Sequence, residues 1–358
     1  MTQKALGVDR VAAIVGHRHA RHGVSNSKHM LYVLRLGRIA FLNAVLVFCG
    51  CGALQLPVQQ PVSSSRTVRS PHSQRPLPAN LRGITYDDIS STCSATPPQI
   101  QTERLLREPT IRVVLDRVAP NCYASSVTTL DRYGYTMGEL IDSSDMKRYS
   151  LASVRKRVSA YLTNLGSSID LWEIGNEVNG EWLSSVRCPS RRECAAQARD
   201  VVSKVIAMYD AVTAAGYATE MTLYYEPPQT VTPGYDMLAW ERTYIPKSMH
   251  SGLRYILVSY YEGSNAGVRP TQAQWDVIFK QLAADFPNAK VGFGEIGLNK
   301  PIGAATLARA TRIFTYYQTL SFPDVPSYTR AGFWWNAAED LVPSTKWPSF
   351  FQTVARYL

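Results

Sequence analysis

Residues 169–182 read IDLWEIGNEVNGEW, and a second stretch far downstream, residues 290–297, reads KVGFGEIG. In each stretch a mostly apolar run leads to a glutamate, Glu177 in the first and Glu295 in the second. Short apolar runs that end in polar residues are typical of strands buried in a parallel sheet. The two stretches therefore predict two buried strands, each with a carboxyl group at its end.

Similar apolar or β-branched runs recur through residues 81–358, with helical patterns between them. Eight strands are predicted: Leu81–Tyr86, Ile111–Leu115, Tyr135–Ile141, Ile169–Gly175, Thr219–Tyr225, Tyr255–Tyr260, Lys290–Gly294 and Ala331–Trp335. The clearest helices are predicted at Leu151–Leu165, Glu193–Ala215, Gln272–Ala284 and Ala304–Leu320. Eight alternating units in a stretch near the typical size of about 250 residues predict an α/β fold, a closed (β/α)8 TIM barrel with a single catalytic domain. A doubly wound sheet is the alternative, but residues 82–85 (RGIT) lack the glycine-rich turn that a nucleotide would need there.

Residues 1–54, here called the leader, have the features of an export signal. Arg35 and Arg38 precede the apolar run Ile39–Phe48, and small residues and cysteines follow it. The run is shorter than the about 20 apolar residues of a membrane span, so we expect a secretory signal, with an uncleaved signal anchor as the alternative. Residues 48–51 (FCGC) resemble a bacterial lipoprotein cleavage box with Cys51 as the lipidated residue, although phenylalanine replaces the usual leucine. We expect an exported protein that is periplasmic, extracellular or an outer-membrane lipoprotein, with membrane contact only through Cys51.

Residues 55–80 are rich in proline and serine and lack apolar periodicity. Such a composition predicts a solvated tether between the leader and the folded domain, which we expect at residues 81–358.

The cysteine count agrees with export. Four of the six cysteines lie beyond the leader: Cys93, Cys122, Cys188 and Cys194. An even number in an exported domain suggests two disulfide bonds, with three possible connectivities. Cys188–Cys194 is the obvious local pair, which would leave Cys93–Cys122.

The positive net charge does not indicate nucleic-acid binding. The chain carries +10, but the leader holds seven basic residues and one acidic residue and so contributes +6 of it. A surplus of +4 over the remaining residues is not a phosphate-binding stripe. Only His72 and His250 follow the leader, so a histidine-rich metal site or a histidine-dependent triad is hard to build. We expect no nucleic-acid partner, no metal and no cofactor.

In a (β/α)8 barrel the chemistry lies at the carboxyl ends of the strands. Glu177 and Glu295 end the fourth and seventh predicted strands, so they would face each other across the barrel mouth. Glycoside cleavage needs such a pair, because one carboxyl must give a proton to the leaving oxygen while the other, ionised, attacks or stabilises the anomeric carbon. Two close carboxyls in a partly dry cleft push their pKa values apart, which creates the acid and the base.

WEIGNEV at residues 172–178, GFGEIG at 292–297 and GFWWN at 332–336 together resemble the clan A glycoside hydrolases, a superfamily of retaining (β/α)8 barrels. The resemblance covers the order and spacing of all eight strands. It implies that Glu177 is the acid/base, that Glu295 is the nucleophile, and that Asn176 binds the sugar hydroxyl next to the anomeric carbon. Val178 stands where cellulase-type members commonly have proline, so the family within the clan stays open.

The same resemblance implies two supporting roles near the nucleophile. Clan members often place a tyrosine at the end of strand six to hydrogen-bond the nucleophile. Strand alternation lets only one of Tyr260 and Tyr261 point inward, and we favour Tyr260. A clan arginine near strand two helps to keep the nucleophile ionised. Arg117 fits by position and Arg112 by side-chain parity, and Arg117 is our candidate.

Further substrate contacts are predicted at other strand ends. Trp335 would form the floor of the sugar subsite, because an indole face packs on the apolar face of a pyranose, while Trp334 would face the helices. Trp182, just past the acid/base, could line another subsite. Asp87 and Glu226 could bind sugar hydroxyls, or serve only as a helix cap and a loop acid.

These features predict an O-glycoside hydrolase that acts on an oligo- or polysaccharide by double displacement, as a monomer. A catalytically inactive carbohydrate-binding barrel of the cell envelope and a transglycosylase are the alternatives.

Overall fold

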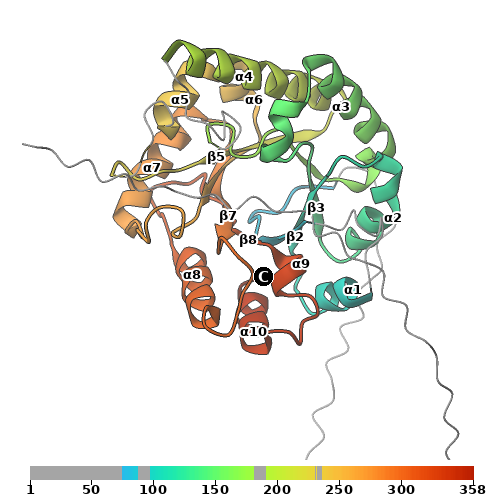
Figure 1. The fold of residues 1–358 in the computed structure, drawn as a ribbon, viewed down its shortest axis with the longest axis vertical. Helices are drawn as coiled ribbons and strands as arrows, with labels where there is room; N and C mark the ends of the chain where they lie inside the picture. Colours follow the sequence, from blue (N-terminus) through green and yellow to red (C-terminus); the bar gives the residue numbers. More distant parts are fainter. Residues whose placement is uncertain (1–74, 88–96, 181–190, 230, 232–235) are drawn as a thin grey trace, which may run out of the picture. The chain divides into compact units, whose positions relative to one another are not determined.

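Eight parallel strands form a closed barrel in the part of the chain that this computed structural model describes (Figure 1). That part comprises residues 75–87, 97–180, 191–229, 231 and 236–358. The strands follow one another around the barrel in chain order, and β8 pairs with β1 to close it. Their bounds are β1 Gly83–Tyr86, β2 Thr110–Val114, β3 Tyr135–Glu139, β4 Leu171–Glu173, β5 Ala218–Tyr224, β6 Tyr255–Tyr260, β7 Lys290–Gly297 and β8 Phe333–Trp335. The predicted (β/α)8 barrel is therefore confirmed, and the doubly wound alternative is wrong.

Helices surround the barrel on its outer side (Figure 1). They are α1 Pro97–Arg104, α2 Pro120–Leu130, α3 Leu151–Leu165, α4 Arg191–Ala214, α5 Met237–Tyr244, α6 Lys247–Gly252, α7 Gln272–Asp285, α8 Leu307–Thr319, α9 Ala337–Asp340 and α10 Pro348–Tyr357, with short 3-10 helices η2 Ser143–Arg148 and η3 Gly166–Ser168. The four predicted helices are present as α3, α4, α7 and α8, with ends that differ by a few residues at most.

The well-predicted helices carry their own start signals and one apolar face. Before α3, the Ser150 hydroxyl accepts a hydrogen bond from the backbone N–H of Ser153, and Val154, Val158 and Tyr161 are buried along one face. The α7 helix begins with a full capping box, in which Thr271 and Gln274 satisfy each other's backbone N–H groups. Local signals of this kind are visible in the sequence before any tertiary contact forms.

The apolar core has two parts. The larger cluster lies between the sheet and the helices and includes residues of every barrel strand except β3. The smaller cluster, here called the apolar plug, fills the amino-terminal part of the barrel interior; it consists of Leu81, Met137, Leu171, Tyr255, Leu257, Ala331 and Phe333. Both faces of the barrel strands are therefore buried.

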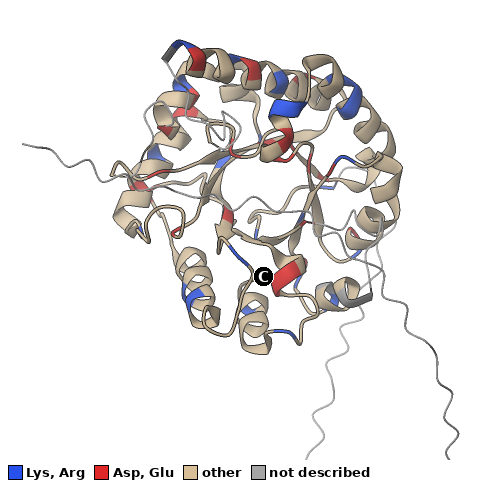
Figure 2. Ribbon diagram, in the orientation of Figure 1, with Lys and Arg blue, Asp and Glu red and all other residues tan. Residues whose placement is uncertain are grey.

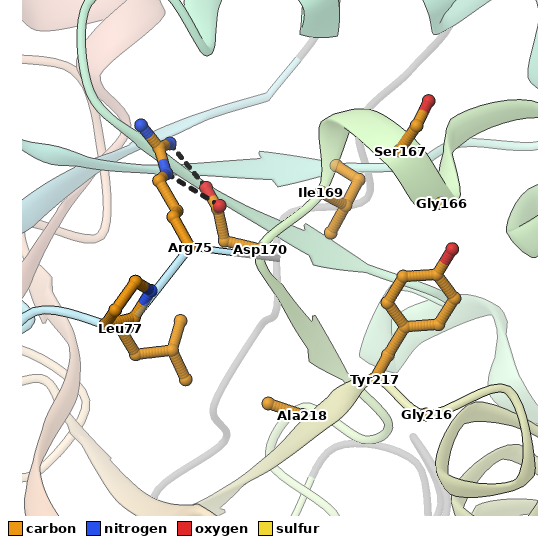
Figure 3. A pocket seen from close by; sticks show the side chains of 10 residues that line it. Arg75, Leu77, Gly166, Ser167, Ile169, Asp170, Gly216, Tyr217 and Ala218 are labelled. Atoms are coloured by element: carbon orange, nitrogen blue, oxygen red, sulfur yellow. Dashed lines mark hydrogen bonds and ion pairs between the residues drawn. The ribbon is translucent and has the colours of Figure 1, made fainter. Parts of the chain in front are cut away.

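Arg75 attaches the start of the described chain to the amino-terminal side of the barrel. Its guanidinium forms ion pairs with Asp170 and Asp131, donates to the carbonyl oxygen of Gly134, and lies over the ring of Tyr135. Figure 3 shows the paired hydrogen bonds between Arg75 and Asp170. The contacts of the folded domain thus begin six residues before the predicted boundary at residue 81.

A pocket of about 550 Å³ lies beside this ion pair (Figure 3). It is lined at the amino ends of β4 and β5, by residues that include Leu77, Ile169, Tyr217 and Ala218. The glutamates predicted to act in catalysis lie at the opposite, carboxyl side of the barrel, Glu177 past the end of β4 and Glu295 near the end of β7. The pocket is therefore separate from the predicted site.

Basic and acidic residues are interspersed over the described helices and loops in the view of Figure 2. No helix within the described ranges is long and apolar enough to cross a membrane.

Several predictions fall outside the described residues. They concern the leader with Cys51, the tether up to residue 74, the two disulfides through Cys93 and Cys188, and the subsite role of Trp182. These stay predictions.

Candidate active site

Glu295, near the carboxyl end of β7, is held by three hydrogen-bond donors. Its Oε1 atom lies 2.7 Å from Nη1 of Arg112 and accepts a 3.0 Å hydrogen bond from Nδ2 of Asn176. Its Oε2 atom accepts a 2.7 Å hydrogen bond from the hydroxyl of Tyr261. The side chain is only 6% exposed. Two neutral donors and one cation therefore fix the orientation of this buried carboxyl group through both of its oxygens.

The backbone of β7 is shaped to bring Glu295 to this position. A Cβ atom at Gly294 would lie 2.8 Å from Cγ2 of Thr222, so the strand can pass here only with glycine. The pairing of β6 with β7 shifts register between Val258 and Tyr260, and the backbone N–H of Glu295 donates to the hydroxyl of Ser259. The end of β7 is thereby fixed against β6 by a side chain as well as by the ladder.

Glu177 lies in a turn just past β4 and is 4% exposed. Its φ angle is 45°, in the left-handed region that non-glycine residues rarely adopt. The turn is tied to β5, because the side chain of Asn179 accepts from the N–H and donates to the C=O of Tyr224, each at 2.8 Å. The N–H of Val178 also donates to the carbonyl oxygen of Thr222. A residue held in a strained conformation by its surroundings is a frequent feature of active sites.

The two glutamates face a common neighbour. Burial raises the pKa of the Tyr261 hydroxyl well above its usual value, and the negative charges of Glu295 and Glu177 raise it further. Burial also raises the pKa of Tyr224, with the charge of Glu177 as the next cause. Glu177 and Glu295 therefore act electrostatically on one tyrosine hydroxyl, although they come from strands on different sides of the barrel.

Two predicted contacts of Glu295 are wrong, and in both cases the alternative residue makes the contact. The hydroxyl of Tyr260 donates to the carbonyl oxygen of Val268, while Tyr261 bonds Glu295. Ser259 points into the barrel, so alternation turns Tyr260 outward and Tyr261 inward.

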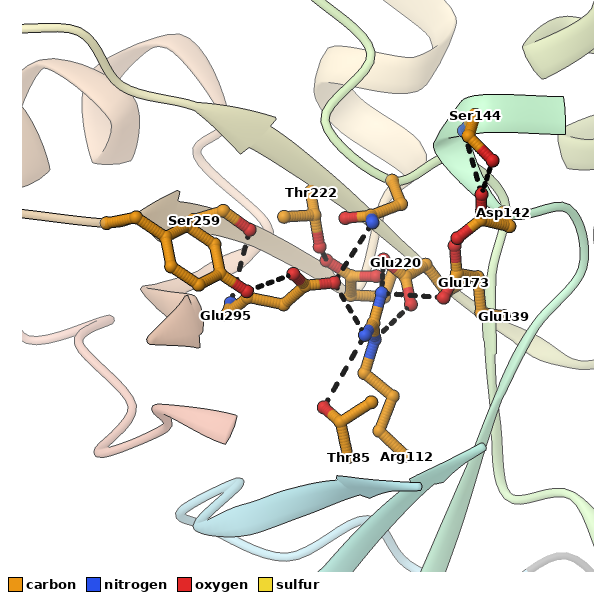
Figure 4. Close-up of polar contacts among 12 residues, drawn as sticks. Thr85, Arg112, Glu139, Asp142, Ser144, Glu173, Glu220, Thr222, Ser259 and Glu295 are labelled. Carbon is orange, nitrogen blue, oxygen red and sulfur yellow. Dashed lines mark hydrogen bonds and ion pairs between the residues drawn. The ribbon is translucent and has the colours of Figure 1, made fainter. Parts of the chain in front are cut away.

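The predicted contact between Arg117 and Glu295 is also wrong. The side chain of Arg117 is 62% exposed and pairs with Asp145, whereas the buried Arg112 contacts Glu295 (Figure 4). Arg112 lies inside β2 and Arg117 beyond its end, so only Arg112 projects into the barrel. Asn176 donates to Glu295, and its predicted contact with a sugar hydroxyl stays a prediction.

The remaining predicted substrate residues keep their status as predictions. Trp334 is buried against Phe314 and Phe350 of the helix layer, and Trp335, at the end of β8, is half-buried. Asp87 and Glu226 are both half-buried beyond the ends of β1 and β5. The strand ends therefore carry these groups on the same side of the barrel as Glu177 and Glu295.

The sequence reading did not identify a set of charged side chains inside the barrel below the site. Besides Arg112 and Glu173, these are Glu139 on β3 and Glu220 on β5. Acidic residues within otherwise apolar strands were the available signal. Among the described residues, no group of three or more metal-binding side chains is arranged to hold a metal ion.

Comparison with known proteins adds evidence on the fold. No protein-family model matches the sequence, and no curated protein matches it either. A psychrophilic β-glucosidase from Micrococcus antarcticus is similar in structure, with a TM-score of 0.51 and 12% identity over 72% of this chain and 88% of its own.

Two further solved structures are similar at lower scores. A Bacteroides uniformis β-glucuronidase has a TM-score of 0.45 and 12% identity over 72% of this chain, and Saccharomyces cerevisiae Gas2p has 0.46 and 13% over 78%. The chain spans 30% of the first protein and 63% of the second. Clan A glycoside hydrolases are among the solved structures that match. At this level of identity the shared feature is the fold, and the comparison with the β-glucosidase leads to the conclusion that this chain has a (β/α)8 barrel of the same kind.

Proposed function

We propose that the protein is a glycoside hydrolase that cleaves an O-glycosidic bond in an oligo- or polysaccharide with retention of configuration. Glu295 is the nucleophile and Glu177 the acid/base. The observation that carries this proposal is the environment of Glu295, a buried carboxyl group oriented by an arginine, an amide and a tyrosine at the end of a barrel strand. A carboxylate held in this way is prepared for attack on an anomeric carbon.

In the proposed first step an oxygen of Glu295 attacks the anomeric carbon while the bond from that carbon to the leaving oxygen breaks. The leaving oxygen keeps the electron pair of the broken bond and takes the proton of Glu177. In the second step Glu177, now ionised, accepts a proton from water, and the water oxygen displaces Glu295 from the sugar. Each step leaves the two carboxyl groups ready for the next one.

Asn176 supports the binding of the sugar next to the reacting carbon. Its Nδ2 atom is used by Glu295, while its buried Oδ1 atom has no hydrogen-bond partner among the described residues. A buried carbonyl oxygen without a partner is costly, and a sugar hydroxyl would satisfy it. The hydroxyl of Tyr261 already donates to Glu295, which leaves Asn176 as the group that can bridge nucleophile and substrate.

The test compares glutamine variants on aryl glycosides with good and poor leaving groups, after a panel of glycosides and polysaccharides has identified a substrate. Glu295→Gln should lose activity on every substrate, because even a good leaving group does not compensate for a missing nucleophile. Glu177→Gln should lose about 100- to 10,000-fold with a phenyl glycoside but much less with a dinitrophenyl glycoside, whose leaving group needs no proton. Nuclear magnetic resonance of the first product should show the anomer of the substrate, and added alcohols would reveal transglycosylation.

Glu262→Gln is the matched control. Glu262 also follows a barrel strand, but both of its carboxylate oxygens accept hydrogen bonds from Arg269. If it loses as much activity as Glu295→Gln while remaining folded, the two glutamates are ordinary loop acids. A wild type that cleaves no member of the panel would equally count against a hydrolase.

A further inference from the structure

Below the proposed active site, the barrel interior carries charged side chains where most barrels carry apolar ones. Arg112, Glu139, Glu173 and Glu220, here called the charge layer, are each at most 1% exposed. Glu139 is in register with Glu173, and Glu173 with Glu220, across β3, β4 and β5. The apolar plug lies on the amino-terminal side of this layer, since Met137 and Leu171 precede two of the glutamates by two residues. Water therefore does not screen the layer from below.

The charges in the layer do not balance if every carboxyl group is ionised. Burial raises the pKa of Glu139 and of Glu220, the charges of Glu173 and Glu295 raise both further, and the charge of Arg112 lowers both. With Glu295 included, one positive charge would face four negative charges, a net charge of −3 in a buried space. Charges buried without partners cost several kcal/mol each, and such groups take up protons instead.

The hydrogen bonds indicate which carboxyl groups are ionised. Both oxygens of Glu173 accept from Arg112, at 2.6 and 3.0 Å, the paired geometry of a guanidinium–carboxylate bond. Glu295 accepts from three donors, of which Arg112 is one. Arg112 is therefore shared between two ionised carboxylates (Figure 4).

The other two glutamates have the surroundings of neutral acids. Glu139 accepts one bond from Arg112 through Oε2, but its buried Oε1 has no partner among the described residues. Glu220 accepts only from the hydroxyl of Thr222, and its Oε2 likewise has no partner there. Burial raises the pKa of both glutamates well above the usual range, and the charge of Glu173 raises both further. Two protons on these groups reduce the net charge from −3 to −1.

We propose that Glu173 is a positioning residue for the proposed reaction, which holds Arg112 in place and balances its charge when Glu295 is esterified, while Glu139 and Glu220 remain neutral acids. Glu295 loses its negative charge when its oxygen bonds the anomeric carbon. Without Glu173 this step would leave a buried arginine with no ionised partner. With Glu173 the layer passes from −1 to 0, and Arg112 keeps a paired carboxylate throughout.

Several titratable groups face the charge layer, and all of them influence how its ionisation changes with pH. They are Arg112 from β2, Glu139 and Asp142 from β3 and its end, Glu173 and Glu177 from β4 and its end, Glu220 from β5, Tyr261 from the end of β6 and Glu295 from β7. The burial-raised pKa values of Asp142 and Tyr261 belong to groups outside the layer.

This inference rests on the proposed function, and two isosteric variants test it. In Glu173→Gln, Arg112 has lost its ionised partner and acts on Glu295 alone. We expect kcat to fall about 10- to 100-fold and the acid limb of the kcat/KM profile to move down by about 1 pH unit. Glu220→Gln replaces one neutral group by another, so kcat and the acid limb should change little. An unmoved acid limb in folded Glu173→Gln, or an equal shift in both variants, would overturn the inference.

An infrared measurement separates this inference from the proposed function, because it needs no substrate. At neutral pH the wild type should show carboxylic-acid C=O absorption that Glu139→Gln and Glu220→Gln each reduce and that Glu173→Gln does not. If Glu139→Gln and Glu220→Gln remove only carboxylate absorption, the assignment of the protons is wrong. If the expected bands are present but no glycoside is cleaved, the proposed function fails and the protonation of the layer stands.

Discussion

Replacing Tyr261 by phenylalanine removes one atom from the site, the hydroxyl oxygen that lies 2.7 Å from Oε2 of Glu295. Burial raises the pKa of this hydroxyl well above its usual value, so it remains a donor through the pH range of an assay. The two other donors, from Arg112 and Asn176, both contact the opposite oxygen, Oε1. The variant therefore leaves Oε2 without its donor.

The size of the effect follows from this single bond. A hydrogen bond to a charged group contributes about 1.5–3 kcal/mol. Since 1.36 kcal/mol corresponds to one pH unit, the acid limb of the kcat/KM profile should move up by about 1–2 pH units. At a pH below the shifted limb, kcat/KM should fall about tenfold for each pH unit by which the limb has moved up, because the fraction of enzyme with Glu295, the proposed nucleophile, ionised falls by the same factor.

The assay measures kcat/KM against pH with the best aryl glycoside for wild type, Tyr261→Phe and Tyr260→Phe. Tyr260 is the matched control, because it carries the same substitution next in the chain and its hydroxyl donates to a backbone carbonyl oxygen. Tyr260→Phe should lower the free energy of unfolding by about 1 kcal/mol and leave the profile in place. Equal profiles for the two variants, or a larger shift for Tyr260→Phe, would refute the reasoning.

Three further substitutions probe stability. Arg112→Met leaves three carboxyl groups without their cation, so we expect a loss of about 3–5 kcal/mol in urea unfolding; an unchanged midpoint would contradict the charge layer. Arg75→Ala leaves Asp170 and Asp131 without their partner and should cost about 2–4 kcal/mol, whereas wild-type stability would mean that the domain begins after residue 75. Burial, and secondarily the charge of Asp285, raises the pKa of Glu241 from 4.5 to about 8, so the native state keeps a proton that the unfolded chain loses in this window. The free energy of unfolding should fall as the pH rises from about 5 to 8, and Glu241→Gln should remove part of that fall. Urea unfolding of both proteins at the two pH values measures this, and an equal fall in wild type and variant would contradict the prediction.

The sequence carried most of the information on the order of the elements. Helix α3 has a serine cap and a regular apolar face, and its bounds were predicted without error. Helix α10 was not predicted, although proline at its start and the spacing of its buried residues Phe350, Phe351 and Val354 were usable signals. The strands were found because barrel strands are short apolar runs, but β4 is shorter than predicted, as its pairing ends where the Glu177 turn begins.

Glu177 and Glu295 could be proposed as a catalytic pair from the sequence because they stand at the ends of the fourth and seventh strands. Which neighbouring side chain meets them could not. In a sheet with one exposed face, alternation of polar and apolar residues reveals which residues point inward. Here both faces of β2 and β6 are buried, so Arg112 and Tyr261 were not distinguished by pattern from Arg117 and Tyr260.

By itself, then, the sequence determined the alternation of strands and helices, the charge balance and the presence of two carboxyl groups at strand ends, since all of these are local properties of the chain. Tertiary structure decided the parity of each strand, the contacts of Glu295 and the meeting of Glu139, Glu173 and Glu220 around one arginine. Those depend on register and barrel closure, which bring together residues from strands far apart in the chain, and no local pattern encodes the distance between them.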